Sequence, residues 1–188
     1  TRADHPSGSD RVFEAIQAID PDGRFEVVLN LQGDLPEMDI TIPATLATAL
    51  STSTADLATL VTPANSDEAA RPQVVKAVVA WNRNDTNDTN DTIAKPGRFG
   101  RALYFSRAAV PTGTHEYLHH IGVYGWRRDA LARFVALPPS PLELAEKLEQ
   151  LRALEAGMSI AIAMVDSAPG GVDTDEDLAN TRRRLGHN

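Results

Sequence analysis

The sequence predicts a mixed α/β domain in which a mostly parallel sheet is flanked by helices. Strand-like and helix-like patterns alternate along the chain, as they do in α/β folds. The apolar content of 42% is ordinary for a globular protein. A length of 188 residues suits one domain with a sizeable core. We therefore expect residues 1–188 to form a single domain.

Six apolar segments, several of them rich in β-branched residues, are predicted to be strands. They cover residues 25–29, 56–61, 74–79, 102–107, 120–126 and 158–165. The first segment is followed by a turn that contains a glycine and Asp34, just before Pro36. This places the Asp34 carboxylate at the carboxyl end of a strand, which is the edge where open α/β sheets bind ligands.

Helices are predicted between these strands. Ser7 or Ser9 caps the first helix, and Ser66 caps a short helical turn over residues 66–70. Apolar residues at helical spacing then mark one continuous amphipathic helix from Leu142 to Leu154, which Gly157 ends. The remaining helices are expected over residues 43–50 and 127–137 and in a closing segment that ends at residues 182–184.

A threefold Asn-Asp-Thr repeat occupies residues 84–92. The repeat is polar, lacks apolar anchors and is made of residues that favour turns, so it predicts a low-complexity surface loop over residues 83–98. Each triplet formally matches a glycosylation acceptor, but nothing in the sequence suggests secretion.

Composition argues against several function classes. A net charge of −8 disfavours a broad nucleic-acid-binding surface. No apolar run approaches the roughly 20 residues that cross a bilayer, so no membrane partner is expected. The chain has no cysteine, which excludes disulfides, thiolate catalysis and cysteine-based zinc sites and fits a cytoplasmic protein. It also lacks Walker-type, G-x-G-x-x-G and G-x-S-x-G motifs.

Two distant carboxylates, those of Asp34 and Asp173, are the candidate metal ligands. Both follow predicted strands, and if they meet in space they can hold Mg²⁺ against a triphosphate. Each has a simpler interpretation when taken alone. Asp34 can be an ordinary turn residue, and Asp173 can be an ordinary helix cap.

Polar residues on the later elements are weaker candidates. His119 and His120 are adjacent, so their side chains point to opposite faces of a strand. His120 shares its face with Tyr124 and could form a polar pocket wall, although a hydrogen-bonded core histidine is the simpler interpretation. Glu149 and Gln150 lie beside the leucines of the amphipathic helix, where a solvated face is the ordinary expectation.

Ordered motifs along nearly the whole chain resemble the 3-deoxy-manno-octulosonate cytidylyltransferase family, also called CMP-Kdo synthetases. The motifs that carry the resemblance occupy residues 5–11, 30–36, 101–107, 120–124, 139–143, 146–152 and 171–174. The resemblance implies a nucleotidyltransferase (Rossmann-like) fold, a homodimer, and an enzyme that transfers CMP from CTP to the acid sugar Kdo, releasing pyrophosphate, for lipopolysaccharide biosynthesis. The alternatives are a non-catalytic sugar- or nucleotide-binding relative and a cytidylyltransferase for another acid sugar.

The resemblance also implies a role for individual residues. It makes Asp34 and Asp173 the Mg²⁺ ligands and the catalytic residues. The nucleotide side of the site is lined by Ser7, Gly8, Arg11 and Gln32. The positions that hold Kdo are Arg107, His120, Tyr124, Glu149 and Gln150.

The chain departs from the family pattern at its start. Family members begin well upstream with a strand and a basic, glycine-containing loop that grips the triphosphate. This sequence does not contain such a segment, and its start at Thr1 has neither a methionine nor a signal peptide. Either the segment is absent from the molecule or it is not represented in this sequence. We therefore expect an N-terminally incomplete domain, begun inside a longer gene product, with little or no activity on its own.

Overall fold

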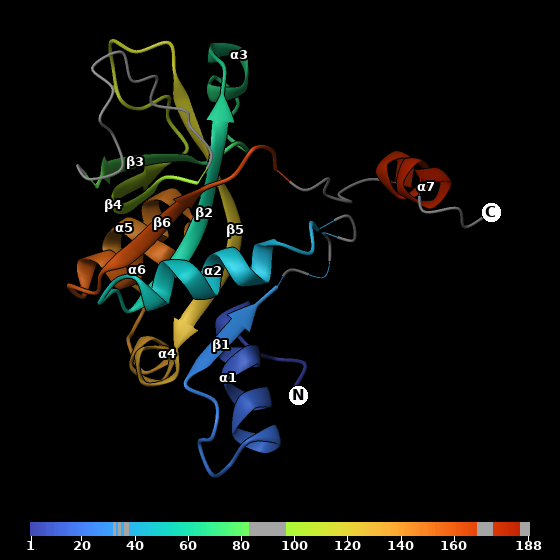
Figure 1. Cartoon of the computed structure of the whole chain (residues 1–188), viewed down its shortest axis with the longest axis vertical. Helices are drawn as coiled ribbons and strands as arrows, with labels where there is room; N and C mark the ends of the chain where they lie inside the picture. Colours follow the sequence, from blue (N-terminus) through green and yellow to red (C-terminus); the bar gives the residue numbers. More distant parts are fainter. Residues whose placement is uncertain (32, 34, 36–37, 83–96, 169–174, 185–188) are drawn as a thin grey trace.

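A computed structural model of the chain describes residues 1–31, 33, 35, 38–82, 97–168 and 175–184. Within this part, six strands form one sheet in the order β1-β5-β2-β6-β4-β3 (Figure 1). The strands are β1 (Val27–Asn30), β2 (Leu57–Ala64), β3 (Lys76–Trp81), β4 (Phe99–Ser106), β5 (Tyr117–Arg127) and β6 (Ile160–Met164). Each strand overlaps one of the predicted segments, which confirms all six as strands.

The predicted strand direction is wrong for the described pairings. Among the described strands, only β2 and β6 pair in parallel, whereas β1–β5, β2–β5, β4–β6 and β3–β4 are antiparallel. β3 also meets β5 where Lys76 faces His119, so the sheet curls toward closure. Parallel neighbours need a long crossover, usually a helix. Instead, β5 lies between β1 and β2 and runs antiparallel to both, so the long strand at this position makes the sheet mixed.

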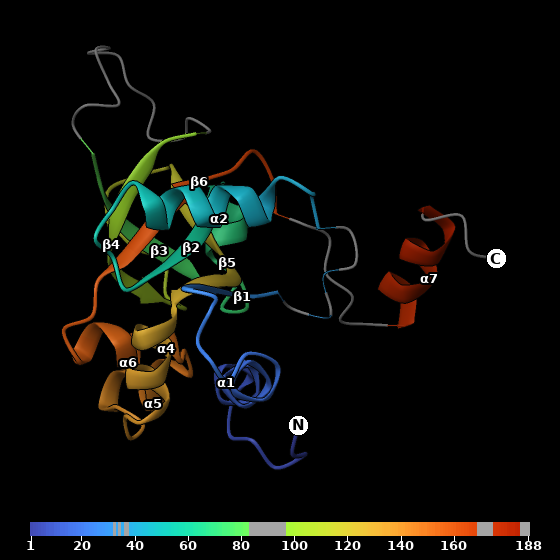
Figure 2. The ribbon, with the colours of Figure 1, turned by 60° about the horizontal axis from the view of Figure 1, so that its bottom comes forward.

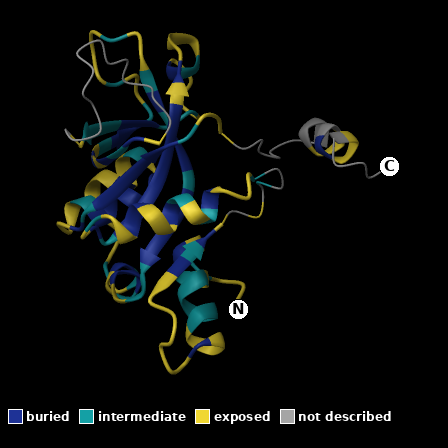
Figure 3. Ribbon diagram, in the orientation of Figure 1, coloured by how far each residue is buried: buried dark blue, intermediate teal, exposed yellow. Residues whose placement is uncertain are grey.

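The sheet is covered on both faces. Figure 2 shows α2 (Ile42–Ser51) over one face and α4 (Arg128–Val135), α5 (Pro141–Glu146) and α6 (Gln150–Glu155) on the other side. Alternation along β2 sends Leu57 to the core beneath α4 and α6 and Leu60 to the core beneath α2. Figure 3 shows the strands buried at the centre and the outer helix surfaces exposed.

Capping residues define where α1 and α3 begin. Ser7 caps α1 (Gly8–Ile19), as one of the two predicted alternatives has it, because its hydroxyl accepts a hydrogen bond from the Asp10 amide. The predicted cap of α3 (Ser66–Ala69) is off by one residue. Asn65 is the cap, and it forms a reciprocal capping box with Glu68. The last helix is α7 (Asp175–Arg184).

The single amphipathic helix predicted from Leu142 to Leu154 is two helices. α5 ends at Glu146 because Lys147 adopts the left-handed conformation, with φ of 55°. A non-glycine residue in this region is costly and must be held by its surroundings. The break turns the chain so that α6 begins at Gln150, against the sheet, instead of continuing along the surface. Apolar spacing alone cannot reveal it, since leucines on both sides keep a helical period.

Within the described part of the chain, no helix is long and apolar enough to cross a membrane.

Candidate active site

A cavity of about 460 Å³ lies between β5 and the break that separates α5 from α6. Four residues predicted to hold a sugar, His120, Tyr124, Glu149 and Gln150, are in its wall although they come from two distant segments. The full lining is Leu35, Gln73, Val75, His120, Gly122, Tyr124, Lys147, Leu148, Glu149 and Gln150.

His120 is buried and hydrogen-bonded at the back of this cavity. Its Nε2 lies 2.9 Å from the Thr59 hydroxyl, and its Nδ1 lies 3.4 Å from the Gln150 amide nitrogen. Burial lowers the pKa of His120 to about 3, and the neighbouring His119 adds to this effect. The imidazole is therefore neutral at physiological pH. His120 is thus a hydrogen-bonded core histidine that also lines a pocket, so the two interpretations drawn from the sequence are compatible.

The depressed pKa of His120 predicts acid-sensitive stability. Below pH 6.5 the unfolded chain binds a proton at this histidine that the folded protein does not bind until about pH 3, so stability is lost as the pH falls through this window. Between pH 6.5 and pH 5 the loss should be about 2 kcal/mol.

Urea unfolding across pH 5 to 8 checks this expectation. A His120→Asn variant should show a flatter dependence than wild type, whereas His119→Asn, on the opposite face of β5, should remove less of the slope. Equal slopes in wild type and His120→Asn would contradict the assignment.

The two carboxylate oxygens of Glu149 differ in their hydrogen bonding. Its Oε1 accepts a hydrogen bond of 2.9 Å from the hydroxyl of Ser9, whereas its Oε2 is buried and has no hydrogen-bond partner among the described residues. Tyr124 is also buried, and burial together with the Glu149 charge raises the pKa of its phenol well above the usual value. The tyrosine therefore keeps its proton, and its hydroxyl group can donate a hydrogen bond to a ligand.

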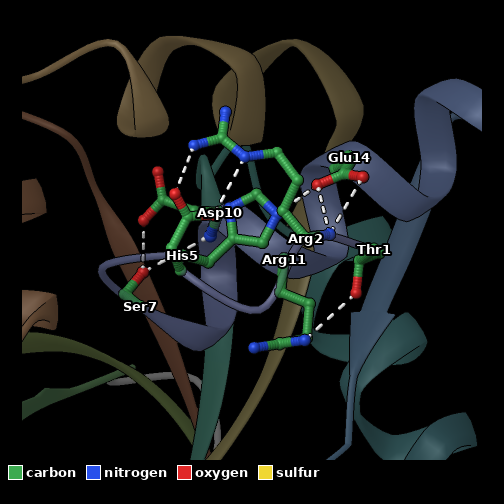
Figure 4. A network of polar contacts seen from close by, with 8 residues as sticks. Thr1, Arg2, His5, Ser7, Asp10, Arg11 and Glu14 are labelled. Carbon is green, nitrogen blue, oxygen red and sulfur yellow. Dashed lines mark hydrogen bonds and ion pairs between the residues drawn. The ribbon is translucent and has the colours of Figure 1, made fainter.

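Three of the four predicted nucleotide-side residues, Ser7, Gly8 and Arg11, lie at the start of α1. The hydroxyl of Ser7 donates to the Asp10 carboxylate over 2.7 Å, and the Arg11 guanidinium donates to the Thr1 hydroxyl over 3.1 Å (Figure 4). Gly8 begins the helix, and Ser9 behind it bonds Glu149. The beginning of α1 is thus tied directly to the cavity wall.

Arg107 is outside the cavity lining. Its guanidinium donates to the backbone carbonyls of Glu146, Pro72 and Lys147, at 2.7, 3.0 and 3.3 Å. Two of these carbonyls flank the end of α5. These contacts therefore secure the helix break that presents Glu149 and Gln150, and a contact with the Kdo carboxylate stays a prediction.

The predicted metal ligands Asp34 and Asp173, and the nucleotide-side Gln32, lie outside the described residues. Leu35, which follows Asp34 in the chain, lines the cavity. Among the side chains that the structure describes, no cluster of three or more histidine, aspartate and glutamate residues could hold a metal ion.

Sequence reasoning missed three residues that shape the site. Thr59 and Ser9 bond the predicted residues His120 and Glu149, and Lys147 forms the helix break. A threonine inside a strand or a serine beside a helix cap has no distinguishing pattern, because its partner lies many residues away. The departure of Lys147 from helical conformation likewise has no local signal.

Comparison with known proteins identifies the family. Residues 1–160 match the Cytidylyltransferase family. The 3-deoxy-manno-octulosonate cytidylyltransferase of Parvibaculum lavamentivorans is 52% identical over 98% of this chain and 67% of its own length. The enzyme of that name from Rhodopseudomonas palustris is 51% identical over 99% of this chain and 71% of its own length.

The fold gives the same result. A solved structure of CMP:2-keto-3-deoxy-manno-octonic acid synthetase complexed with CTP superposes with a TM-score of 0.80 at 34% identity, over 99% of this chain and 70% of that one. Family match, sequence identity and fold agree, and the chain belongs to the 3-deoxy-manno-octulosonate cytidylyltransferase family.

Proposed function

We propose that the cavity beside β5 binds the sugar acid Kdo in a reaction that transfers CMP from CTP to Kdo and releases pyrophosphate. The observation that carries this proposal is the convergence of His120, Tyr124, Glu149 and Gln150 on one cavity. The names of the relatives and the CTP bound in the similar structure support the substrates.

The chemistry of the wall suits a polyhydroxylated acid. A sugar hydroxyl both donates and accepts hydrogen bonds. The Oε2 of Glu149, which has no partner among the residues that the structure describes, can accept one, and the phenol of Tyr124 can donate one. Lys147 adds a cation to the lining, which complements the carboxylate of an acid sugar. Buried polar groups left unpaired without the correct ligand give strong discrimination.

The nucleotide is expected on the Ser7–Arg11 side, where the helix start supplies backbone N–H groups and Arg11 supplies a charge. The Ser9–Glu149 hydrogen bond fixes this side relative to the sugar side. The protein would thereby hold the two reactants in one orientation, which is the main protein contribution to phosphoryl transfer chemistry.

Asp34 and Asp173 would hold Mg²⁺, the metal that prefers one or two carboxylates together with phosphate oxygens. The fit rests on carboxylate chemistry and on Leu35, the residue after Asp34 in the sequence, which lines the cavity. A bound cation would offset the repulsion between the two anionic substrates and favour the deprotonated sugar hydroxyl.

The resemblance further supports a homodimer that works in the cytoplasm for lipopolysaccharide biosynthesis. Exposed apolar side chains, Leu103 on β4 and Leu144 on α5, are consistent with contacts to a second subunit. The net charge of −8 supports the absence of a nucleic-acid partner.

Pyrophosphate release from the full-length protein with CTP, Mg²⁺ and Kdo tests the function. Replacing Gln150 by leucine should lower kcat/KM for Kdo by about 100-fold, because a polar sugar group then meets an apolar side chain in the buried wall. The KM for CTP should not change.

Gln17→Leu, on the exposed face of α1, is the matched control and should leave both values unaltered. A Gln150→Leu loss shared equally by CTP and Kdo would contradict the sugar assignment. Faster turnover of another acid sugar would replace Kdo as the substrate, and binding without pyrophosphate release would indicate a non-catalytic relative.

A further inference from the structure

The hydroxyl of Thr59 lies at an irregularity in the sheet. Thr59 pairs with Tyr124, but the next residue of β2, Leu60, pairs with Ile121, so β5 holds extra residues at this point. The Thr59 side chain is buried there, and its oxygen lies 3.0 Å from the carbonyl of Ile121 and 2.8 Å from that of Val123. The same oxygen is 2.9 Å from His120 Nε2.

These contacts determine where the imidazole proton resides. Both carbonyls are acceptors only, so the single Thr59 hydroxyl proton is directed to them. The Thr59 oxygen can then interact with His120 Nε2 only as an acceptor, which requires a proton on Nε2. Because burial keeps the ring neutral, Nδ1 carries none and must accept a hydrogen bond.

The proton on His120 in turn orients the Gln150 amide. The group that faces Nδ1 has to be the NH₂ end, and the contact of 3.4 Å joins these two nitrogens. The amide oxygen is then the end left to accept a hydrogen bond from a ligand in the cavity that Gln150 lines. Phe105 and Tyr124 pack against the His120 ring at centroid distances of 4.8 and 5.7 Å, which restricts its rotation.

We propose that Thr59 is a positioning residue for the sugar site, because its hydroxyl selects the tautomer of His120 and thereby the end of the Gln150 amide that meets the ligand. The hydrogen-bond chain stands on the geometry above, and only its kinetic consequence rests on the proposed function. Thr59 is outside the cavity lining and acts through two other side chains.

The tautomer can be measured directly in the full-length protein by ¹H–¹⁵N correlation of the imidazole nitrogens, assigned with a His120→Asn variant. Wild type and Thr59→Ser should show a protonated Nε2 and a bare Nδ1. Thr59→Val keeps the shape of the side chain but removes the acceptor, so the Nδ1–H form should gain population. An Nδ1–H form in wild type would overturn the proposal, whether or not any variant folds.

Kinetics supply the second readout. Thr59→Val should lower kcat/KM for Kdo by about 10-fold, the equivalent of one misplaced hydrogen bond, with the KM for CTP unchanged. Thr59→Ser, which keeps the hydroxyl, should have a kcat/KM for Kdo within about threefold of the wild-type value. Thr62→Val is the matched control, because Thr62 is another buried threonine of β2 and lies opposite His119. It should change neither the tautomer nor the kinetics.

The two failures are distinguishable. Absence of pyrophosphate release by wild type would refute the proposed function, and the tautomer measurement would still decide the role of Thr59. A folded Thr59→Val protein with the wild-type tautomer and an unchanged kcat/KM for Kdo would refute the positioning role while leaving the function intact.

Discussion

Asp34→Ala or Asp173→Ala in the full-length protein is expected to lower kcat by at least about 1,000-fold, or about 4 kcal/mol of transition-state stabilisation. Each change removes a proposed carboxylate ligand of Mg²⁺, and a metal at this position would stabilise charge that develops during transfer. The expected loss is larger than that for Gln150→Leu, since one affects the reacting centre and the other the recognition of one substrate.

The structural support for this prediction comes from the neighbours of Asp34. β1 ends at Asn30, which pairs with Tyr124 in the cavity wall, and Leu35 lines the same cavity. Asn30 and Leu35, two described residues close to Asp34 in the sequence, therefore adjoin the proposed sugar site.

Initial rates of pyrophosphate release over a Mg²⁺ titration provide the measurement. Asp34→Asn and Asp173→Asn, which keep the shape but lose the charge, should fail like the alanine variants at every Mg²⁺ concentration. Asp22→Ala, at an exposed position before β1, is the control and should retain wild-type rates. Near-wild-type turnover in either ligand variant would refute the metal assignment.

Local sequence patterns predicted the elements well but not how they are joined. Each strand could be recognised because β-branched and apolar residues in short runs favour extended backbone. Their direction depends on which strands become neighbours, and that is decided by β5, which enters between β1 and β2. No pattern within β5 contains this information.

For the candidate site, too, the residues could be predicted but not the backbone arrangement that brings them together. The resemblance pointed to His120, Glu149 and Gln150, and the structure brings them to one cavity. Apolar periodicity alone placed Glu149 on a solvated helix face, because it could not detect the break at Lys147. The break is stabilised from outside by Arg107, whose hydrogen bonds to the carbonyls of Glu146 and Lys147 join segments about 40 residues apart.

Arg152→Met is expected to reduce the free energy of unfolding by about 3 to 5 kcal/mol at pH 7. Arg152 and Glu143 form a buried ion pair that ties α6 to α5, with Nε and Oε2 2.7 Å apart and a second contact through Nη2. Arg152 also stacks over Phe134, 4.8 Å from the ring centroid. Methionine can replace the packing, but it leaves the Glu143 carboxylate buried without its cation.

The effect should depend on pH with a definite sign. In wild type, burial raises the pKa of Glu143, but the hydrogen bonds from Arg152 and Ser140 together outweigh burial, so the net pKa is lowered. The ion pair therefore stabilises the fold at pH values above the pKa of the unfolded carboxyl group, and this contribution is lost as the pH falls. In Arg152→Met the unpaired carboxylate takes up a proton more readily. The difference between the two proteins should therefore shrink toward pH 4.5.

Urea unfolding at pH 7 and pH 4.5 measures both effects. The double variant Glu143→Leu with Arg152→Met should recover much of the lost stability, because it leaves no unpaired charge. Arg133→Met removes an exposed arginine that pairs with Asp56, and it should cost less than about 1 kcal/mol. If the double variant were as unstable as Arg152→Met, lost packing and not the orphaned carboxylate would be the cause. Because Gln150 and Arg152 share α6, Arg152→Met should also weaken Kdo recognition, and the double variant should restore both properties together.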